Sequence, residues 1–280
     1  MTDIALLGAG GKMGLRLATN LQGSPYDVKH VEISDQGRRR LADELGVACV
    51  ERDEALAGAD VVLMAVPDNL IGKIAHGFID QVKSGARIIV LDAAAPYDGQ
   101  LPHRDDVTYF VTHPCHPPLF NDETDPAARA DFFGGVAAKQ NIVCALMQGP
   151  DEDYGLCEDI ARTIYKPVMR SHRVTLEHMA ILEPALSETV GATLVQALRD
   201  ATDEAARRGV PKDAAMDFML GHLSIELAIL FDVLPGQFSD GAKMAIERAG
   251  SVIFKEGWLD RVFAPEAVRA SVAEICKTSD

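Results

Sequence analysis

The stretch that decides the fold is Ile4-Ala-Leu-Leu-Gly8-Ala-Gly10-Gly11-Lys12-Met13-Gly14, which runs on into Leu-Arg-Leu-Ala-Thr-Asn20. Its first four residues are apolar, as in a buried parallel strand, and residues 14–20 have the pattern of a helix. Glycines between a strand and a helix let backbone amides approach a phosphate, and the helix N-terminus faces the negative charge. The stretch therefore predicts a strand, a dinucleotide-binding loop and a helix.

An acidic residue further along the chain supports this interpretation. Glu32 follows Gly14 by 18 residues, at the end of a second predicted strand, where a carboxylate can accept hydrogen bonds from both ribose hydroxyls of NAD. NADP remains an alternative, because Arg38, Arg39 and Arg40 follow closely and are able to pair with a 2′-phosphate.

A second turn at the carboxyl end of a strand belongs to the same predicted site. It has the sequence Val66-Pro67-Asp68-Asn69 and follows the strand at 61–65, where an open sheet binds its ligand. Asp68 or Asn69 can equally serve only to cap a helix. The residues expected to bind NAD are Gly8, Gly10, Gly11, Lys12, Met13, Gly14, Glu32, Pro67 and Asp68.

Short apolar runs alternate with helical patterns over the first 170 residues, which indicates βα units and a parallel sheet. The expected strands cover residues 4–7, 28–33, 61–65, 88–92, 109–112 and 142–146, with a possible seventh near Val168. After Thr175 the pattern is helical, at about 176–208, 213–230, 241–256 and 265–277. We predict an NAD-binding Rossmann domain at 1–173, doubly wound with a mostly parallel sheet, and an all-α domain for substrate binding and dimerisation at 174–280.

The composition excludes several classes of protein. A chain of 280 residues with 48% hydrophobic residues can bury a large core, and its net charge of −15 repels nucleic acids and anionic membrane surfaces. No apolar run reaches the roughly 18 residues of a membrane span, and the chain starts with a strand rather than a leader. The five cysteines are scattered without a CxxC pair, so we expect reduced thiols and a cytoplasmic protein.

The most unusual segment is Thr112-His113-Pro114-Cys115-His116-Pro117-Pro118, which places two imidazoles on a proline-stiffened segment at a strand end. Such a pair can bind one divalent metal jointly, or divide into a ligand and a base. The alternative is that either ring only bonds to a loop carbonyl. We expect Cys115, whose side chain should point away from both neighbours, to have a packing role.

A second polar cluster opens the helical domain between Thr175 and Glu188. It contains Glu177, His178, Glu183 and Glu188. Burying an isolated carboxylate is costly, so Glu183, which lies between Leu182 and Pro184, either reaches solvent or meets a cation.

With these motifs placed, the chain resembles the β-hydroxyacid and 6-phosphogluconate dehydrogenase superfamily over nearly its full length, although the catalytic lysine of that superfamily is missing here. Its Thr-His-Pro also looks like prephenate dehydrogenase, and its helical-domain acids are similar to those of ketol-acid reductoisomerase. In the glycine loop, the His-Pro-Cys-His-Pro segment and the Glu-Pro helix, the chain resembles the D-apionate oxidoisomerase family. That resemblance implies oxidation and skeletal rearrangement of a branched sugar acid.

The sequence therefore predicts an NAD-dependent oxidoreductase in which a divalent metal of the Zn, Mn or Mg class, held by His113 and Glu183, assists oxidation and rearrangement of a sugar acid. His116 and Glu188 complete the predicted catalytic set, with Glu177 and His178 as further candidates. The alternatives are a simple or decarboxylating NAD(P)-dependent hydroxyacid dehydrogenase and a non-catalytic NAD-binding regulator. We also expect a homodimer, because the helical domain is strongly apolar.

Overall fold

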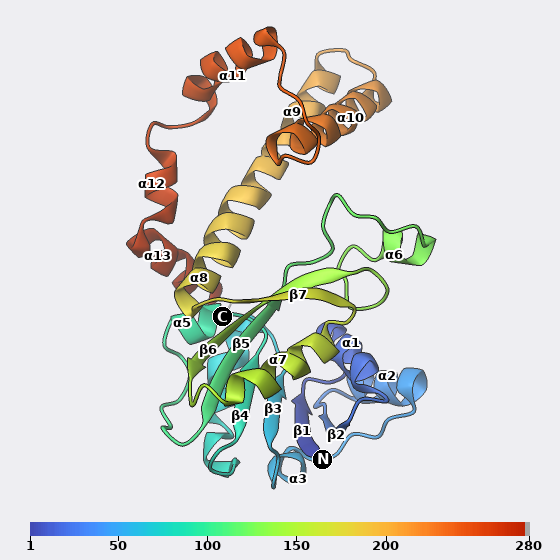
Figure 1. The fold of residues 1–280 in the computed structure, drawn as a ribbon, viewed down its shortest axis with the longest axis vertical. Coiled ribbons are helices and arrows are strands. Elements are labelled where there is room, and N and C mark those ends of the chain that lie inside the picture. The colour runs from blue at the N-terminus through green and yellow to red at the C-terminus, as the bar shows by residue number, and fades with distance from the viewer. Residues whose placement is uncertain (278–280) are drawn as a thin grey trace. The chain divides into compact units, whose positions relative to one another are not determined.

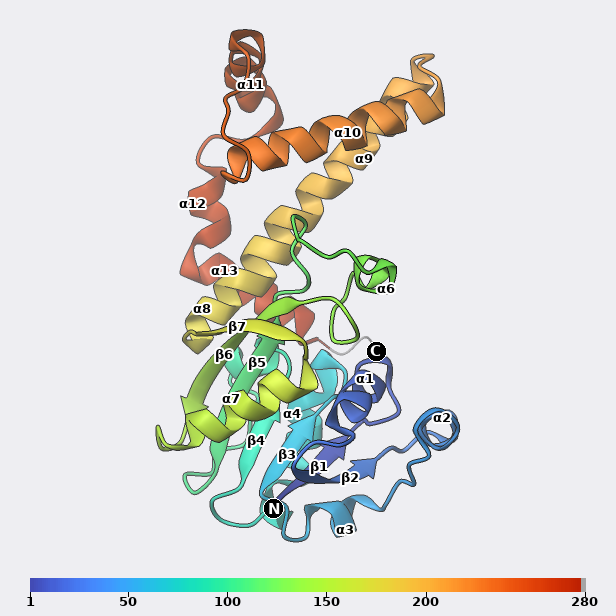
Figure 2. The same ribbon diagram turned by 45° about the vertical axis from the view of Figure 1, so that its right-hand side comes forward.

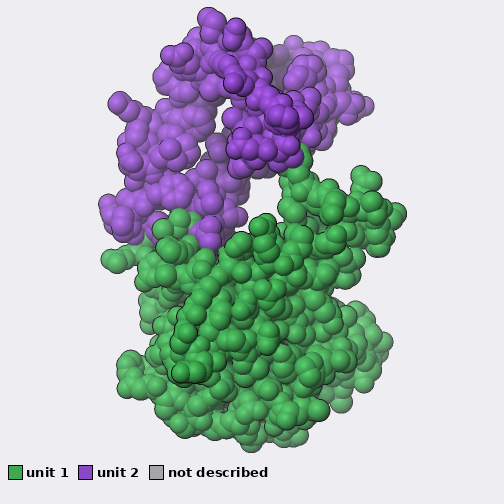
Figure 3. All heavy atoms as spheres, viewed as in Figure 1, with its two compact units in different colours: residues 1–181, 269–280 green, residues 182–268 purple. Residues whose placement is uncertain are grey.

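The computed structural model describes residues 1–277, which divide into two compact units (Figures 1 and 3). Unit 1 contains Met1–Ile181 together with the chain from Arg269 onward, and unit 2 is Leu182–Val268. The division falls later than the predicted boundary near residue 173, because helix α8 (Leu176–Ala180) packs on unit 1. Its Met179 is buried in a cluster with residues of the sheet.

Unit 1 is built on a seven-stranded sheet with the order β2-β1-β3-β4-β5-β6-β7. Every neighbouring pair is parallel except β5 and β6, which are antiparallel. This confirms the predicted doubly wound, mostly parallel Rossmann sheet. Its strands are β1 (Thr2–Leu7), β2 (Tyr26–Val31), β3 (Val61–Met64), β4 (Arg87–Val90), β5 (Thr108–Pro114), β6 (Gln140–Gln148) and β7 (Val168–Arg173).

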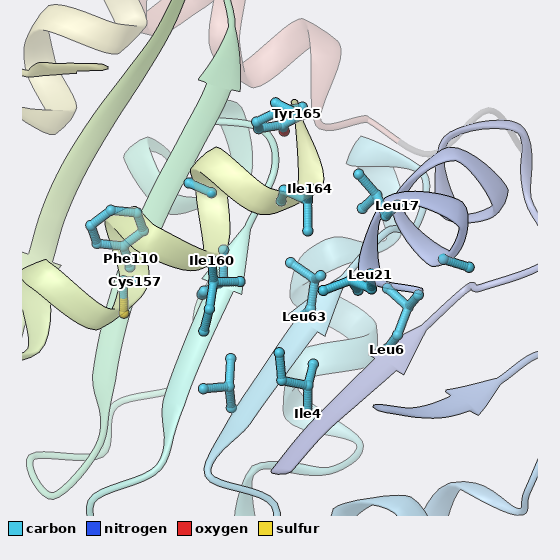
Figure 4. Close-up of a cluster of buried hydrophobic side chains, with 14 of the residues drawn as sticks. Ile4, Leu6, Leu17, Leu21, Leu63, Phe110, Cys157, Ile160, Ile164 and Tyr165 are labelled. Atoms are coloured by element: carbon cyan, nitrogen blue, oxygen red, sulfur yellow. The ribbon is translucent and has the colours of Figure 1, made fainter. Parts of the chain in front are cut away.

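Helices cover both faces of the sheet (Figure 2). On one face, Leu17 and Leu21 of α1 meet Ile160 and Ile164 of α7 above the sheet (Figure 4). On the other, Met179 of α8 packs with residues of β5 and β6. The helices of this unit are α1 (Lys12–Leu21), α2 (Asp35–Leu45), α3 (Arg52–Leu56), α4 (Ile71–His76), α5 (Ala94–Tyr97), α6 (Pro126–Ala130), α7 (Asp153–Ile164) and α8. Four of them were not predicted from the sequence: α3, α5, α6 and α7.

Unit 2 is wholly helical, as predicted. A π-helix at Ile181–Ala192 continues α8, and it contains Pro184, whose missing N–H cannot join a regular α-helical ladder. Helix α12 lies between two of the helical segments predicted from the sequence, 241–256 and 265–277, and was not itself predicted. The other helices are α9 (Thr193–Arg207), α10 (Lys212–Leu230), α11 (Asp240–Ile253), α12 (Trp258–Phe263) and α13 (Pro265–Ile275), the last of which continues into unit 1.

Within residues 1–277, no helix combines the length and the apolar character that crossing a bilayer requires. All five cysteines lie in this described part, and all are free thiols.

The glycine loop, residues 8–14, is packed too tightly for side chains. A Cβ at Gly10 would lie 2.5 Å from the backbone of Gly37 on α2, and a Cβ at Gly14 would overlap the carbonyl oxygen of Gly8. These glycines are therefore required by the approach of α1 and α2 to β1, in addition to any contact with a phosphate.

We predict that Gly14→Ala lowers the free energy of unfolding by about 1–3 kcal/mol, because the backbone must move to admit the methyl group, and that it weakens NADH binding. Gly155→Ala is the matched control, since Gly155 lies on α7 with nothing within 4 Å of an added Cβ and alanine favours a helix by about 1 kcal/mol. Urea denaturation and fluorescence titration with NADH measure both effects. Wild-type stability in Gly14→Ala would contradict this account of the loop.

Candidate active site

The N-terminus of α1 is arranged to receive an anion. Gly11 occupies the N-cap position and makes no side-chain hydrogen bond to the helix, so the first amides of α1 lack a side-chain cap. Such amides, together with the helix dipole, favour a phosphate group. Lys12 is exposed beside them, whereas the Met13 side chain packs against the hydrophobic core of unit 1. Met13 is therefore placed to meet a cofactor through its backbone.

Glu32 lies directly after β2 and is buried, with 7% of its surface exposed. Its carboxylate accepts hydrogen bonds from the Gly10 amide at 2.9 Å, the Ser34 amide at 2.8 Å and the Ser34 hydroxyl at 3.0 Å. Burial raises the pKa of Glu32, but these hydrogen bonds together lower it below its ordinary value. The carboxylate is therefore charged near pH 7, and it connects the glycine loop to the end of β2.

Two of the three arginines after β2 are engaged within the protein. Arg38 Nε donates to the Glu32 carbonyl oxygen at 2.6 Å, and its guanidinium pairs with Glu51. Arg40 donates to the Gly10 carbonyl oxygen at 3.0 Å. Arg38 is thus held at the end of β2 and Arg40 at the glycine loop, and both guanidinium groups already have partners within the protein.

The turn after β3 lies at the same edge of the sheet. Pro67 and Asp68 are both exposed, and Asp68 starts a short 3₁₀ helix at Asp68–Leu70. Their contact with a cofactor stays a prediction.

His113 lies near the end of β5 with a fixed ring orientation. Its Nδ1 is 2.9 Å from the carbonyl oxygen of Leu91, and because a carbonyl only accepts, Nδ1 carries the proton and Nε2 the lone pair. Burial lowers the pKa of His113 most strongly, while the Leu91 carbonyl and the charge of Asp92 act in the opposite direction. The neutral imidazole that metal binding requires is therefore favoured.

Three side chains form a possible metal-ligand group. One ligand atom each of Asp92, His113 and Glu183 lies within 4.8 Å of the others. Asp92 follows β4, and its carboxylate accepts the Ala94 amide at 2.7 Å. Glu183 follows α8 by one helical turn, in the π-helix. The structure thus brings together the predicted pair His113 and Glu183, and adds Asp92.

Asp92 was missed as a ligand in the sequence. The signal was present, since it lies in the turn Asp92-Ala-Ala-Ala-Pro96 at the carboxyl end of a predicted strand. Nothing local distinguishes it, however, from an acid that only caps the short helix α5.

His116 lies close to His113, with ring centroids 6.2 Å apart and nearly perpendicular. Its backbone has a φ of 60°, a left-handed conformation that is uncommon for residues other than glycine. Its Nδ1 donates to the carbonyl oxygen of Phe133 at 2.9 Å. His116 therefore presents its Nε2 lone pair close to the ligand group without belonging to it.

The other candidates of the helical segment lie elsewhere. His178 forms a capping box with Thr175 at the start of α8, which gives it a local structural role. Glu177 and Glu188 are exposed, and neither belongs to the ligand group. Cys115 is also exposed, which contradicts its expected packing role.

These features define a dinucleotide-dependent oxidoreductase: a Rossmann sheet, an uncapped helix at its glycine loop, an acid after β2, and polar groups after β4 and β5. Residues 121–276 match the family described as phosphogluconate dehydrogenase (decarboxylating) C-term, and residues 3–96 match NADP oxidoreductase coenzyme F420-dependent. The chain is 57% identical to a D-apionate oxidoisomerase of Rhizobium rhizogenes, over 98% of this chain and all of that one. The protein belongs to the D-apionate oxidoisomerase family and is an NAD-dependent oxidoreductase.

Two further comparisons agree. A D-apionate oxidoisomerase of Cupriavidus necator is 55% identical over 97% of this chain and 98% of its own length. A crystal structure described as a semialdehyde dehydrogenase NAD-binding protein from Cupriavidus necator in complex with calcium and NAD has a TM-score of 0.96 and 54% identity, covering 98% of this chain and 100% of that one. A ketol-acid reductoisomerase of Psychrobacter arcticus is 28% identical over 41% of this chain and 34% of its own length.

We predict that Glu32→Gln lowers the preference for NAD over NADP by about 10- to 100-fold, because it removes a buried negative charge where the 2′-phosphate would lie. The preference is the ratio of kcat/KM for the two cofactors. Glu44→Gln removes the same charge from the exposed last turn of α2 and should leave this ratio unchanged. An unchanged ratio in Glu32→Gln would remove Glu32 from cofactor selection.

Proposed function

We propose that the protein oxidises and rearranges D-apionate to 3-oxo-isoapionate, with NAD⁺ as the hydride acceptor. The observation that carries this proposal is the group Asp92, His113 and Glu183, in a chain of the D-apionate oxidoisomerase family. The reaction balances as D-apionate plus NAD⁺ giving the rearranged keto acid, NADH and one proton. Rearrangement of the carbon skeleton changes neither the molecular formula nor the overall oxidation state of the substrate.

The ligand group suits a divalent cation. One imidazole nitrogen and two carboxylates are donors that Zn, Mn or Mg accept, and the relative of known structure from Cupriavidus necator is described as a complex with calcium and NAD. An ion held by Asp92, His113 and Glu183 would act as a Lewis acid toward neighbouring oxygens of the substrate. The hydrogen bond of His113 to the Leu91 carbonyl and that of Asp92 to the Ala94 amide would keep these two side chains in the required orientation.

The other residues of the site bind the cofactor or transfer protons. The amides at the start of α1 bind the diphosphate, and Glu32 binds the adenosine ribose. His116 is the base that we propose for the proton of the substrate hydroxyl, because its Nε2 carries the lone pair. Glu188, one π-helical turn after Glu183, is the second acid-base candidate.

A decarboxylating hydroxyacid dehydrogenase is the second candidate function. The match of residues 121–276 to the C-terminal family of decarboxylating phosphogluconate dehydrogenase favours it. The carbon skeleton of the product, read by NMR, distinguishes the two: an oxidoisomerase retains every carbon in a rearranged chain, whereas a decarboxylase releases carbon dioxide.

We further propose a homodimer formed through unit 2. Only Ala215 of α10 is buried, whereas Phe218, Leu220, Ile225 and Leu230 on the same helix are between 56% and 68% exposed. A second copy is the occupant we propose. The five free thiols agree with the cytoplasm as the compartment, and the net charge of −15 disfavours nucleic acid as a partner.

We predict that His113→Ala and Glu183→Ala each lower kcat/KM for D-apionate by at least about 100-fold, since loss of a metal ligand removes both affinity and orientation. Chelation of the wild-type enzyme should have the same effect, reversed by adding a divalent ion. NADH formation at 340 nm measures turnover. Glu177→Gln, which changes an exposed acid outside the ligand group, should remain active. Turnover that resists chelation and both substitutions would exclude the metal.

For the dimer, light scattering should give a mass about twice that of the 30.2 kDa chain. Phe218→Asp should shift this mass toward the monomer, because a charge cannot be buried unpaired in an apolar interface. Leu119→Asp is the control, since it places the same charge on an exposed apolar position of unit 1. A monomeric wild-type protein would refute the proposal.

A further inference from the structure

An aromatic ring in unit 1 lies against the two cations of the cofactor helix. Lys12 Nζ is 4.8 Å from the centre of the Phe133 ring, and Arg16 Cζ is 5.2 Å from it. Both cations belong to the first two turns of α1, the helix whose N-terminus faces the expected diphosphate. The attraction between a cation and the ring face holds these side chains close to that end of the helix.

The same residue contacts the proposed base. The rings of Phe133 and His116 are 6.0 Å apart and nearly perpendicular, and the Phe133 carbonyl oxygen accepts the hydrogen bond from His116 Nδ1. Edge-to-face contact and hydrogen bond together select one ring orientation and one tautomer of His116. Phe133 thus contacts both the diphosphate end and the reaction end of the site.

The segment that carries Phe133, residues 131–138, is held firmly. The Asp131 carboxylate accepts three backbone amides, from Val136, Ala137 and Ala138. From α1, Asn20 donates to the Gly135 carbonyl oxygen at 2.8 Å. The position of Phe133 is therefore set by the fold, although its side chain is exposed.

Hydrophobic burial does not account for this placement. Phe133 is 53% exposed, and its neighbour Phe132 is 80% exposed, so the ring gains little from exclusion of water. What it does gain is electrostatic, because its faces attract Lys12 and Arg16.

We propose that Phe133 is a positioning residue, which orders Lys12 and Arg16 for the cofactor diphosphate and orients His116 for the substrate proton. The second half of this role rests on the function proposed above, in which His116 is the base. The first half concerns cofactor binding alone.

The test compares Phe133→Leu, which keeps apolar bulk but removes the ring, with Phe133→Tyr, which keeps the ring. Two cation–π contacts at an exposed site correspond to about 5- to 30-fold in affinity. We expect Phe133→Leu to raise the Kd for NADH and the KM for NAD⁺ by that factor and to lower kcat about 10-fold. Phe133→Tyr should keep all three values close to those of the wild type. Phe132→Leu, which changes the exposed neighbour, should match the wild type.

A double-mutant cycle tests the effect on His116. If Phe133 orients His116, then His116→Ala should lower kcat less in the Phe133→Leu background than in the wild type. Circular dichroism and thermal unfolding verify that each variant is folded. Additive effects of the two substitutions would overturn the orienting role, and so would an equal loss in Phe132→Leu.

Titration with NADH in the absence of substrate, monitored by fluorescence, tests the cofactor role of Phe133 independently of the proposed function. An unchanged Kd in Phe133→Leu would refute the role in ordering Lys12 and Arg16, whatever the substrate. Absence of turnover with D-apionate in the wild type would refute the proposed function, while the NADH titration would still decide the cofactor half of the role of Phe133.

Discussion

The parallel arrangement of β1, β3, β4 and β5 is the constraint on which the site of unit 1 depends. Parallel strands end at the same edge of a sheet, so whatever follows each strand is brought to that edge. The glycine loop follows β1, Asp92 follows β4, and His113 lies near the end of β5. Backbone hydrogen bonding alone therefore gathers residues as far apart in the chain as Gly8 and His113.

Local hydrogen bonds then fix the orientation of the side chains at this edge of the sheet. The Glu32 carboxylate holds the Gly10 amide, and the Leu91 carbonyl fixes the tautomer of His113. In both cases a buried ionisable group obtains its partner from the backbone, which offsets part of the cost of removing it from water. The same bonds that stabilise the fold thus accompany a charged Glu32 and a neutral His113, whose pKa values both lie below their ordinary values.

Chain continuity explains why the helical segment supplies Glu183. Met179 fixes α8 against the sheet, and the π-helix that follows begins one residue after α8 ends. The β-hydroxyacid dehydrogenase superfamily, which the chain resembles, has a catalytic lysine on this helical segment. Here the segment has carboxylates, which bind a cation under the proposed function.

Much of this was determined by the sequence alone. Apolar runs identified all seven strands, the glycine spacing identified the tight loop between β1 and α1, and the proline-stiffened histidines indicated His113, one member of the possible ligand group, because these signals depend on neighbouring residues. The tertiary structure decided the rest: that Asp92 completes the ligand group, that His178 only caps a helix, that Cys115 faces outward, and that Phe133 lies between Lys12 and His116. The contacts of Asp92 and Phe133 join residues distant in the chain and exist only after the sheet has brought the strand ends together, whereas the cap of His178 is local and is decided by where α8 begins.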